Sequence, residues 1–175
     1  MFNILKERHP MINNDYILYP LFGGEGAHTA MITELFSDPE VTKYLHRNTP
    51  FTTDSNKRVS PSEFTSFMEA EDHNFYYAIC PLGDESHPIG LASLHGFNEE
   101  ERSASLGIVL MRKAWSQGIG TDTIHKLIEM AKQHRLTTLK ANVQIDNTHS
   151  LEIFKMLFGD FTTDSGYAKF TYKIL

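Results

Sequence analysis

The segment from Leu106 to Ala131 constrains the fold more than any other part of this 175-residue chain. It begins as an apolar run with the composition of a β-strand and passes through a short basic loop that ends in Gln117-Gly118-Ile119-Gly120. A helix follows at once, because apolar residues recur at helical spacing, at Ile124, Leu127, Ile128 and Ala131. The segment therefore predicts a strand that turns through glycines directly into the N-terminus of an amphipathic helix.

A helix N-terminus of this kind suits an anion such as a phosphate or pyrophosphate, because its backbone N–H groups are exposed and the helix dipole is positive there. Arg112 and Lys113 beside the turn favour an anion in a chain that is acidic overall. The loop lacks the Gly-Lys-Ser/Thr end of a Walker A sequence and the G-x-G-x-x-G dinucleotide fingerprint. A tight strand-to-helix turn without a ligand is the alternative interpretation of the loop taken alone.

The composition is that of one globular domain, with 41% hydrophobic and 22% charged residues, preceded by an arm at residues 1–14. The net charge of −6 and the absence of a Lys/Arg run argue against a nucleic-acid partner. The one cysteine, Cys80, excludes an internal disulfide and fits a reducing compartment. No apolar run has the length of a membrane span and the N-terminus lacks a signal-peptide layout, so we expect a cytoplasmic protein without a membrane partner.

Strand and helix signals follow one another in the order β-α-α-α-β-β-β-α-β-α-β-β. We expect helices at 27–36, from Asp38, at 60–71 after a loop at 48–60, at 117–134 and from 148. We expect strands at 16–21, 75–79, 89–97, 103–110, 138–143, 160–163 and 167–173. This order predicts an α+β fold, with a mixed, mostly antiparallel central sheet flanked by helices and one parallel crossover carried by helix 117–134.

A second segment, from Ala141 to Leu157, combines an alternating strand, a turn and a capped helix. Together the two segments resemble the GNAT N-acetyltransferases, and most closely the RimJ/RimL-like branch of ribosomal-protein N-terminal acetyltransferases. The loop form W-G-K-G-x-G/A-T of that branch is matched by residues 115–121, and A-N-V-x-x-x-N-x-x-S by residues 141–150. Its phrases L-x-P-L and L-x-x-D-P-E-V-x-x-Y-L are matched by residues 18–21 and 35–45. The resemblance covers about residues 16–175.

The resemblance implies a single GNAT-like domain in which strands 103–110 and 138–143 splay apart and acetyl-CoA inserts between them. Backbone groups of Ile108, Val109 and Leu110 would pair with its pantetheine arm. Asn147 would bond the cofactor or the end of its neighbouring strand, although it could equally be a helix N-cap. The loop and the following helical turn would hold the pyrophosphate, through Ser116, Gln117, Gly118, Ile119, Gly120 and Thr121. Trp115 is a further cofactor-binding candidate.

Acetyl transfer from a thioester to an amine needs aligned reactants, a base, and a proton for the leaving thiolate. Many relatives place a tyrosine four residues after the serine of the last helix and a glutamate on the strand before the loop. Here those positions hold Phe154 and Ser105, so the base must come from elsewhere or act through water. The candidate catalytic residues are Ser105, Ser150 and His95. Further candidate bases are Glu34 and the acidic triplet Glu99 to Glu101, which could equally form a solvated turn.

These features predict an acetyl-CoA-dependent N-acetyltransferase that acts on a primary amine by direct attack in a ternary complex. The amine could be a protein N-terminus, a polyamine, an amino acid or an aminoglycoside-like small molecule. The alternative is a catalytically silent acyl-CoA-binding module. The nine histidines show no H-E-x-x-H pattern and have no cysteine partner, so we expect no metal, while a homodimer stays open.

Overall fold

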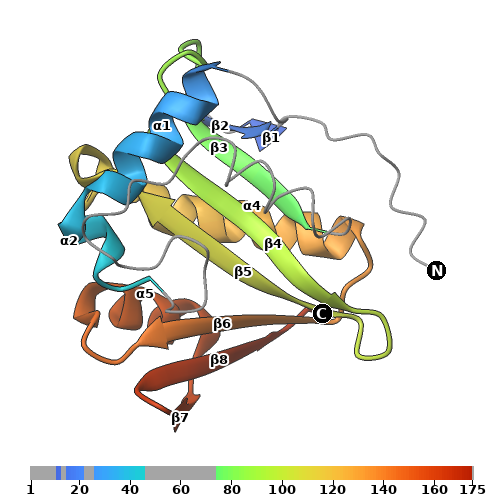
Figure 1. Cartoon of the computed structure of the whole chain (residues 1–175). Coiled ribbons are helices and arrows are strands. Elements are labelled where there is room, and N and C mark those ends of the chain that lie inside the picture. Colours follow the sequence, from blue (N-terminus) through green and yellow to red (C-terminus); the bar gives the residue numbers. More distant parts are fainter. Residues whose placement is uncertain (1–10, 13–14, 22–25, 46–73, 175) are drawn as a thin grey trace.

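The computed structural model describes residues 11–12, 15–21, 26–45 and 74–174 of the chain. The predicted loop at 48–60 and helix at 60–71 lie outside these residues. Within them the strands form one eight-stranded sheet in the order β1-β2-β3-β4-β5-β6-β8-β7 (Figure 1). All neighbouring strands are antiparallel except β5 and β6, which are parallel and joined through helix α4. The predicted α+β class is confirmed.

The elements lie close to the predicted ranges. The helical elements are α1 (Gly26–Ser37), α2 (Pro39–Thr42), the 3-10 helix η1 (Arg112–Ala114), α4 (Ile119–Gln133) and α5 (Thr148–Phe158). The strands are β1 (Met11–Ile12), β2 (Tyr16–Pro20), β3 (Phe75–Pro81), β4 (Gly90–Asn98), β5 (Ser103–Leu110), β6 (Thr138–Gln144), β7 (Phe161–Asp164) and β8 (Tyr167–Lys173).

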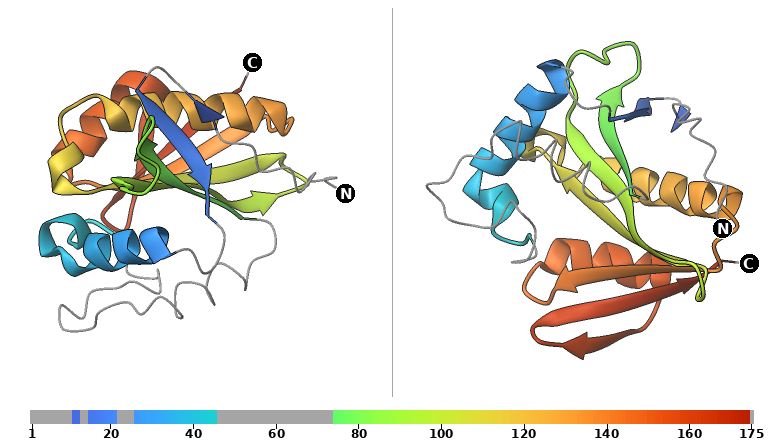
Figure 2. Two further views of the ribbon diagram at one scale, coloured as in Figure 1. Left: turned by 90° about the horizontal axis from the view of Figure 1, so that it is seen from above. Right: turned by 45° about the vertical axis from the view of Figure 1, so that its right-hand side comes forward.

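The sheet separates two hydrophobic cores, because successive side chains of a strand point to opposite faces. Helices α4 and α5 cover one face and helices α1 and α2 cover the other, as the view from above shows (Figure 2). On β5, Ala104 and Leu106 belong to the core under α4, whereas Val109 packs toward α1 and α2. Odd-numbered residues of β5 therefore share the α1/α2 face with the even-numbered residues of β6, since Leu139 and Ala141 face α4.

Two predictions about the ends of elements need correction. The arm predicted at residues 1–14 already contributes to the sheet, because Met11 pairs with Leu18 and Ile12 with Ile17. A strand of two residues is too short to show a period in the sequence, so this pairing could not be found there. The helix predicted from residue 117 begins at Ile119, because Gly118 has a left-handed conformation (φ +79°) and ends the loop as the N-cap.

Candidate active site

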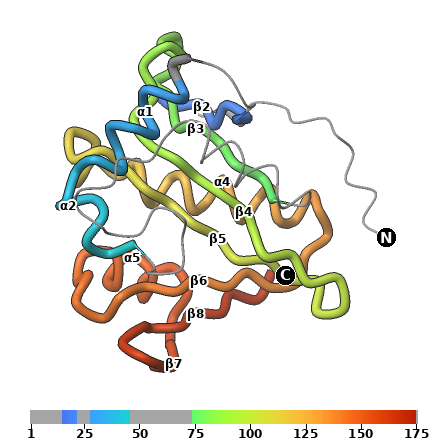
Figure 3. The backbone as a smooth tube through the Cα atoms, in the orientation of Figure 1, coloured from blue at the N-terminus to red at the C-terminus, as the bar shows by residue number. Residues whose placement is uncertain are grey.

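The two edges of β5 are paired to different extents. Along β4 the antiparallel register runs from His95 opposite Ser105 to Gly90 opposite Leu110. Along β6 the parallel register is limited to Ser103, Ala104 and Ser105. Beyond Ser105 the two strands separate, which the backbone tube shows as a widening angle between β5 and β6 (Figure 3). Among the described residues, no strand pairs with this edge of β5 beyond Ser105.

The alternation of antiparallel pairing tells which peptide groups face that edge. The N–H of Met111 donates to the carbonyl of Ile89 at 2.9 Å, which continues the register with β4 by one residue. Peptide groups of alternate residues point to opposite edges of a strand, so Val109 directs its groups to β4, whereas Leu106, Ile108 and Leu110 direct theirs away from it. Of the three residues expected to pair with a pantetheine arm, two therefore present backbone groups to the open edge.

The loop after β5 ends at an uncapped helix N-terminus. Among the described residues, no side chain caps α4, a helix of 15 residues, and a Cβ added at Gly118 would meet no atom within 4 Å. Trp115, Ser116 and Gln117 are exposed on the loop, and the Trp115 indole N–H donates to the Leu110 carbonyl at 2.9 Å. A helix N-terminus that follows a glycine and has no side-chain cap among the described residues fits a pyrophosphate.

The basic residue that suggested an anion at this loop is engaged with an acidic one. Arg112 Nε donates to Asp38 Oδ2 at 2.6 Å, and the other oxygen of Asp38 caps α2 by accepting from the Glu40 N–H at 2.9 Å. Asp38 therefore holds the start of α2 against the beginning of the loop. The sequence could not show this contact, because the two residues are 74 positions apart.

Two predicted catalytic residues come together where β5 and β6 separate. Ser105 lies opposite His95 on β4, and both face the α1/α2 side of the sheet. His95 Nδ1 lies 3.1 Å from the hydroxyl of Ser93, a buried residue that sequence reasoning did not single out. Only the period-two spacing of Ser93, His95 and the strand register could have indicated it.

The third predicted catalytic residue lies on the other side of the sheet. Ser150 is in the first turn of α5, and its backbone N–H donates to Asn147 Oδ1 at 3.3 Å. Asn147 is thus the N-cap that the sequence left open as an alternative. Phe154, at the usual tyrosine position, is buried and packs at 5.2 Å from Phe158 and 5.6 Å from Phe170 between ring centroids.

The acidic candidates for the base are less suited to that role. Glu101 accepts hydrogen bonds from the Lys140 ammonium and from the Ser103 hydroxyl, the latter at 3.1 Å. These bonds, that of Lys140 above all, hold the pKa of the Glu101 carboxyl below its usual range, which weakens it as a base. Glu99 and Glu100 lie in the exposed turn between β4 and β5, and Glu34 is exposed on α1.

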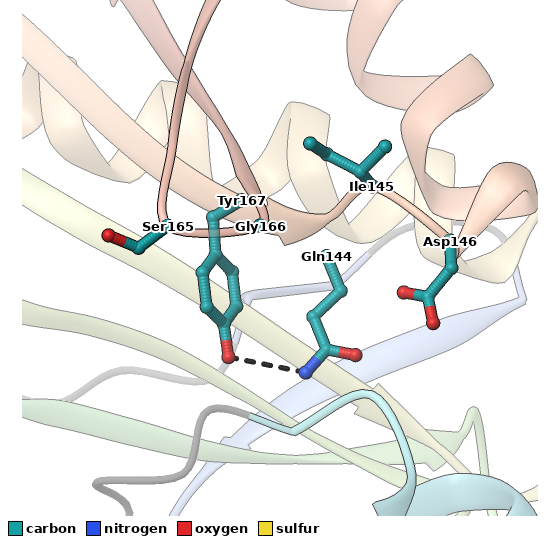
Figure 4. Close-up of a pocket in the computed structure, with 6 residues that line it drawn as sticks. All are labelled: Gln144, Ile145, Asp146, Ser165, Gly166 and Tyr167. Atoms are coloured by element: carbon teal, nitrogen blue, oxygen red, sulfur yellow. Dashed lines mark hydrogen bonds between the residues drawn. The ribbon is translucent and has the colours of Figure 1, made fainter.

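A shallow pocket of about 580 Å³ lies at the end of β6, on the same face as Ser105 (Figure 4). Gln144 and Tyr167 oppose each other across β6 and β8, and Gln144 Nε2 donates to the Tyr167 hydroxyl at 3.2 Å. Asp146 supplies a carboxylate beside them. The sequence did not indicate this pocket, because the register of β6 with β8 brings its two sides together.

The part of the chain that the structure describes contains no group of three metal-ligating side chains placed to hold an ion. Nor do the described helices include one with the length and apolar character needed to cross a membrane.

Comparison with known proteins gives the family. The Acetyltransferase (GNAT) domain model matches residues 23–157, and the chain accordingly belongs to the GNAT acetyltransferases, which use acetyl-CoA. A relative described as an uncharacterized N-acetyltransferase p20, from Bacillus licheniformis, is 29% identical over 128 residues, covering 73% of this chain and 70% of that protein. The chain is therefore an N-acetyltransferase.

Two solved structures illustrate the shared fold. Spermidine N-acetyltransferase from Vibrio cholerae, in complex with CoA and spermine, superposes with a TM-score of 0.72 at 14% identity over 93% of this chain and 97% of that one. Ribosomal-protein-S5-alanine acetyltransferase from Vibrio fischeri gives 0.71 at 14% identity over 95% and 97%. At these identities the likeness establishes the fold and does not extend to the acceptor.

Proposed function

We propose that this N-acetyltransferase carries the acetyl group of acetyl-CoA directly to a primary amine, both substrates being bound at once. The observation that carries the proposal is the unpaired edge of β5, which leads from the open helix N-terminus at Gly118 to the point where β5 and β6 meet at Ser105. From Leu110 to Ser105 the strand rises about 17 Å, at roughly 3.3 Å per residue, a length that an extended pantetheine arm can follow.

In this arrangement the cofactor binds as an added strand. The peptide groups of Ile108 and the N–H of Leu110 pair with the pantetheine arm, while Val109 supports them from the ladder with β4. The pyrophosphate lies on the first turn of α4, from Gly118 to Thr121, where backbone N–H groups and the helix dipole favour negative charge. The exposed loop residues Trp115, Ser116 and Gln117 form the rim of this site.

The thioester then lies near Ser105, and the amine approaches from the α1/α2 face. An acyl-CoA thioester is already activated, so the protein mainly aligns the amine with the carbonyl carbon and accepts its proton. Ser105 and His95 lie on the acceptor side, whereas Ser150 approaches from the α5 side, where the thiolate leaves. The pocket with Asp146 and Tyr167 extends the acceptor face and suits a cationic amine.

The amine itself is proposed as a class. A protein N-terminus follows from the resemblance to the RimJ/RimL-like branch and has the V. fischeri enzyme as a structural neighbour. A polyamine has the V. cholerae enzyme as its neighbour and fits the acidic balance of the chain, with a net charge of −6. Free amino acids and aminoglycoside-like amines complete the set to be tested.

An acetyl-transfer screen tests the proposal. The protein and acetyl-CoA are incubated with peptides, polyamines, amino acids and aminoglycosides, and free CoA thiol is measured. We expect one class to release CoA above the background rate and to yield the acetylated amine by mass spectrometry. Binding is followed in parallel by thermal shift, where CoA and acetyl-CoA should raise the melting temperature more than ATP or NAD does.

The second candidate function is a catalytically silent acyl-CoA-binding module. The burial of Phe154 in an aromatic cluster favours it, because no phenolic proton donor stands at that position. A CoA-specific thermal shift without turnover for any amine in the screen would select this module over the enzyme.

A further inference from the structure

We infer that His95 is the general base of the acetyl transfer and that Ser93 orients its imidazole. The inference rests on the proposed function and adds the residue that replaces the missing glutamate. Ser105 occupies the glutamate position of many relatives, but a hydroxyl cannot hold the amine proton at neutral pH. His95 stands directly opposite Ser105 on the next strand, so the base is displaced by one strand and stays on the same face.

The location of His95 suits a group that meets the reacting atoms. The parallel register of β5 with β6 ends at Ser105 opposite Lys140, which marks the inner end of the unpaired edge. His95 is half-buried at this level and faces the α1/α2 side, from which the amine approaches. An amine between this face and a thioester on β5 would lie beside the imidazole.

A glycine on β5 leaves room for the imidazole. A Cβ at Gly107 would lie 3.4 Å from His95 Cε1 and 2.8 Å from Ser93 Oγ. The ring therefore extends from β4 over the backbone of β5, toward the edge along which the pantetheine arm would run. A side chain at 107 would be too close to the Ser93 hydroxyl and would contact the imidazole, so Ser93 would have to shift.

Ser93 holds the imidazole of His95 in place. Ser93 is 7% exposed, and its hydroxyl lies 3.1 Å from His95 Nδ1. When Nδ1–H donates to Ser93 Oγ, the lone pair is on Nε2, and this nitrogen accepts the proton of the amine. Ser93 is thus a positioning residue, because it acts through the imidazole.

The proton balance is simple. The neutral amine attacks the thioester carbon, a C–N bond forms and the C–S bond breaks, so that the amine loses one proton to His95 Nε2 as the thiolate leaves. The imidazolium returns that proton, directly or through water, to the thiolate, and the products are the amide and CoA thiol. Lys140 lies beside Ser105 on β6, and its ammonium donates to the carboxylate of Glu101.

The test uses His95→Ala and His95→Gln with the amine identified by the screen. We expect kcat to fall by about 10²–10⁴-fold in both, while CoA affinity and melting temperature stay near those of the parent. Added imidazole should restore part of the rate to His95→Ala and none to His95→Gln, whose side chain fills the site. The control is His87→Ala, which removes an exposed histidine of the β3–β4 hairpin and should leave the rate unchanged.

Ser93→Ala separates a positioning role from a structural one. Alone it should lower kcat by about five- to tenfold, the worth of one hydrogen bond, and in the His95→Ala background it should have no further effect. An equal loss in both backgrounds would show that Ser93 does not act through His95.

The failure of this inference differs from the failure of the proposed function. A parent protein that transfers acetyl groups, with His95→Ala within about threefold of it, overturns the assignment of the base alone. A parent that releases no CoA with any amine overturns the proposed function and this inference with it.

Discussion

The two halves of β5 meet different environments, although they belong to one strand. From Ser103 to Ser105 the strand has neighbours on both edges, and the side chains beneath it are fully buried under α4. From Leu106 to Leu110 it keeps β4 and loses β6, and its residues are mostly half-buried. The first half holds the sheet together, and the second has one edge without a paired strand among the described residues, where we propose that the ligand binds. The comparison teaches that this sheet forms the proposed binding edge by ending the pairing of β5 with β6 early.

The largest effect is expected at Gly118, where the loop that follows the second half of β5 meets α4. Gly118→Asp should reduce CoA affinity below detection, because its carboxylate would occupy the position of the pyrophosphate and repel it. The fold should survive the strain of a left-handed non-glycine residue, since a Cβ at 118 meets no atom within 4 Å among the described residues. Isothermal titration with CoA measures the change.

The matched control for charge is Gly118→Asn, which has nearly the same shape and tolerates the left-handed conformation. It should bind CoA at least about tenfold more tightly than Gly118→Asp, a difference of about 1.4 kcal/mol. Gly83→Asp carries the same backbone strain (φ +83°) in the β3–β4 hairpin and should bind as the parent does. Unchanged CoA affinity in Gly118→Asp would place the phosphate site elsewhere.

The second prediction contrasts the two halves by stability. Leu139→Ala removes a side chain of β6 that is 0% exposed and lies opposite Ala104, and it should cost about 2–5 kcal/mol. Ile108→Ala, in the open half, should cost the ligand-free protein only about 1 kcal/mol, since this residue is half-buried. Urea unfolding measures both, and equal losses would contradict the division of β5 into two halves.

The third prediction concerns the cap of α5. Asn147→Ala should lower the free energy of unfolding by about 1 kcal/mol, because Asn147 Oδ1 accepts the Ser150 N–H. Asn147→Asp keeps this acceptor and should restore the stability. If the Asn147 amide also donates to CoA, then CoA affinity falls in both variants, and if affinity is unchanged in Asn147→Asp the residue is a cap alone.

The smallest effect is expected for His134, at the C-terminal end of α4. His134 ends α4 and stacks on Phe75 with ring centroids 4.8 Å apart. Burial lowers the pKa of His134 below its usual 6.5, so the unfolded chain takes up this proton more readily than the folded one. The contribution of neutral His134 to the free energy of unfolding is complete above about pH 6.5. This contribution is lost as the pH falls toward the lowered pKa of the folded protein.

His134→Gln provides the comparison for this pH dependence. Thermal unfolding of both proteins between about pH 5 and 8 should show the advantage of the parent shrinking on the acid side. A constant difference across the range would show that His134 does not contribute through its titration.

The sequence predicted what depends on neighbouring residues. The strand, glycine loop and helix from Leu106 to Ala131 were correct to within two residues at each boundary, because periodicity and turn chemistry are local. The fold class followed from the order of these elements. The splay of β5 from β6 came from family resemblance alone, since no local pattern tells where a parallel pairing ends.

The site was predicted less completely, because its contacts depend on register. The register of β4 with β5 places Ser93 opposite Gly107, and His95 then lies over this glycine, 3.1 Å from the Ser93 hydroxyl. The sequence does not show this register. The sequence suggested that Arg112 could bind an anion, but in the structure Asp38, at the start of α2, accepts its hydrogen bond. Such contacts follow from three-dimensional packing and leave no mark on the spacing of the residues involved.

The unpaired edge of β5 also bears on solubility. Exposed strand edges attract other extended chains, and most proteins shorten or cover them. Here the Trp115 indole N–H covers the carbonyl of Leu110, while the peptide groups of Leu106 and Ile108 have no strand beside them in the described part of the chain. A ligand that binds along β5, as proposed, would occupy the same groups and so keep this edge from other extended chains.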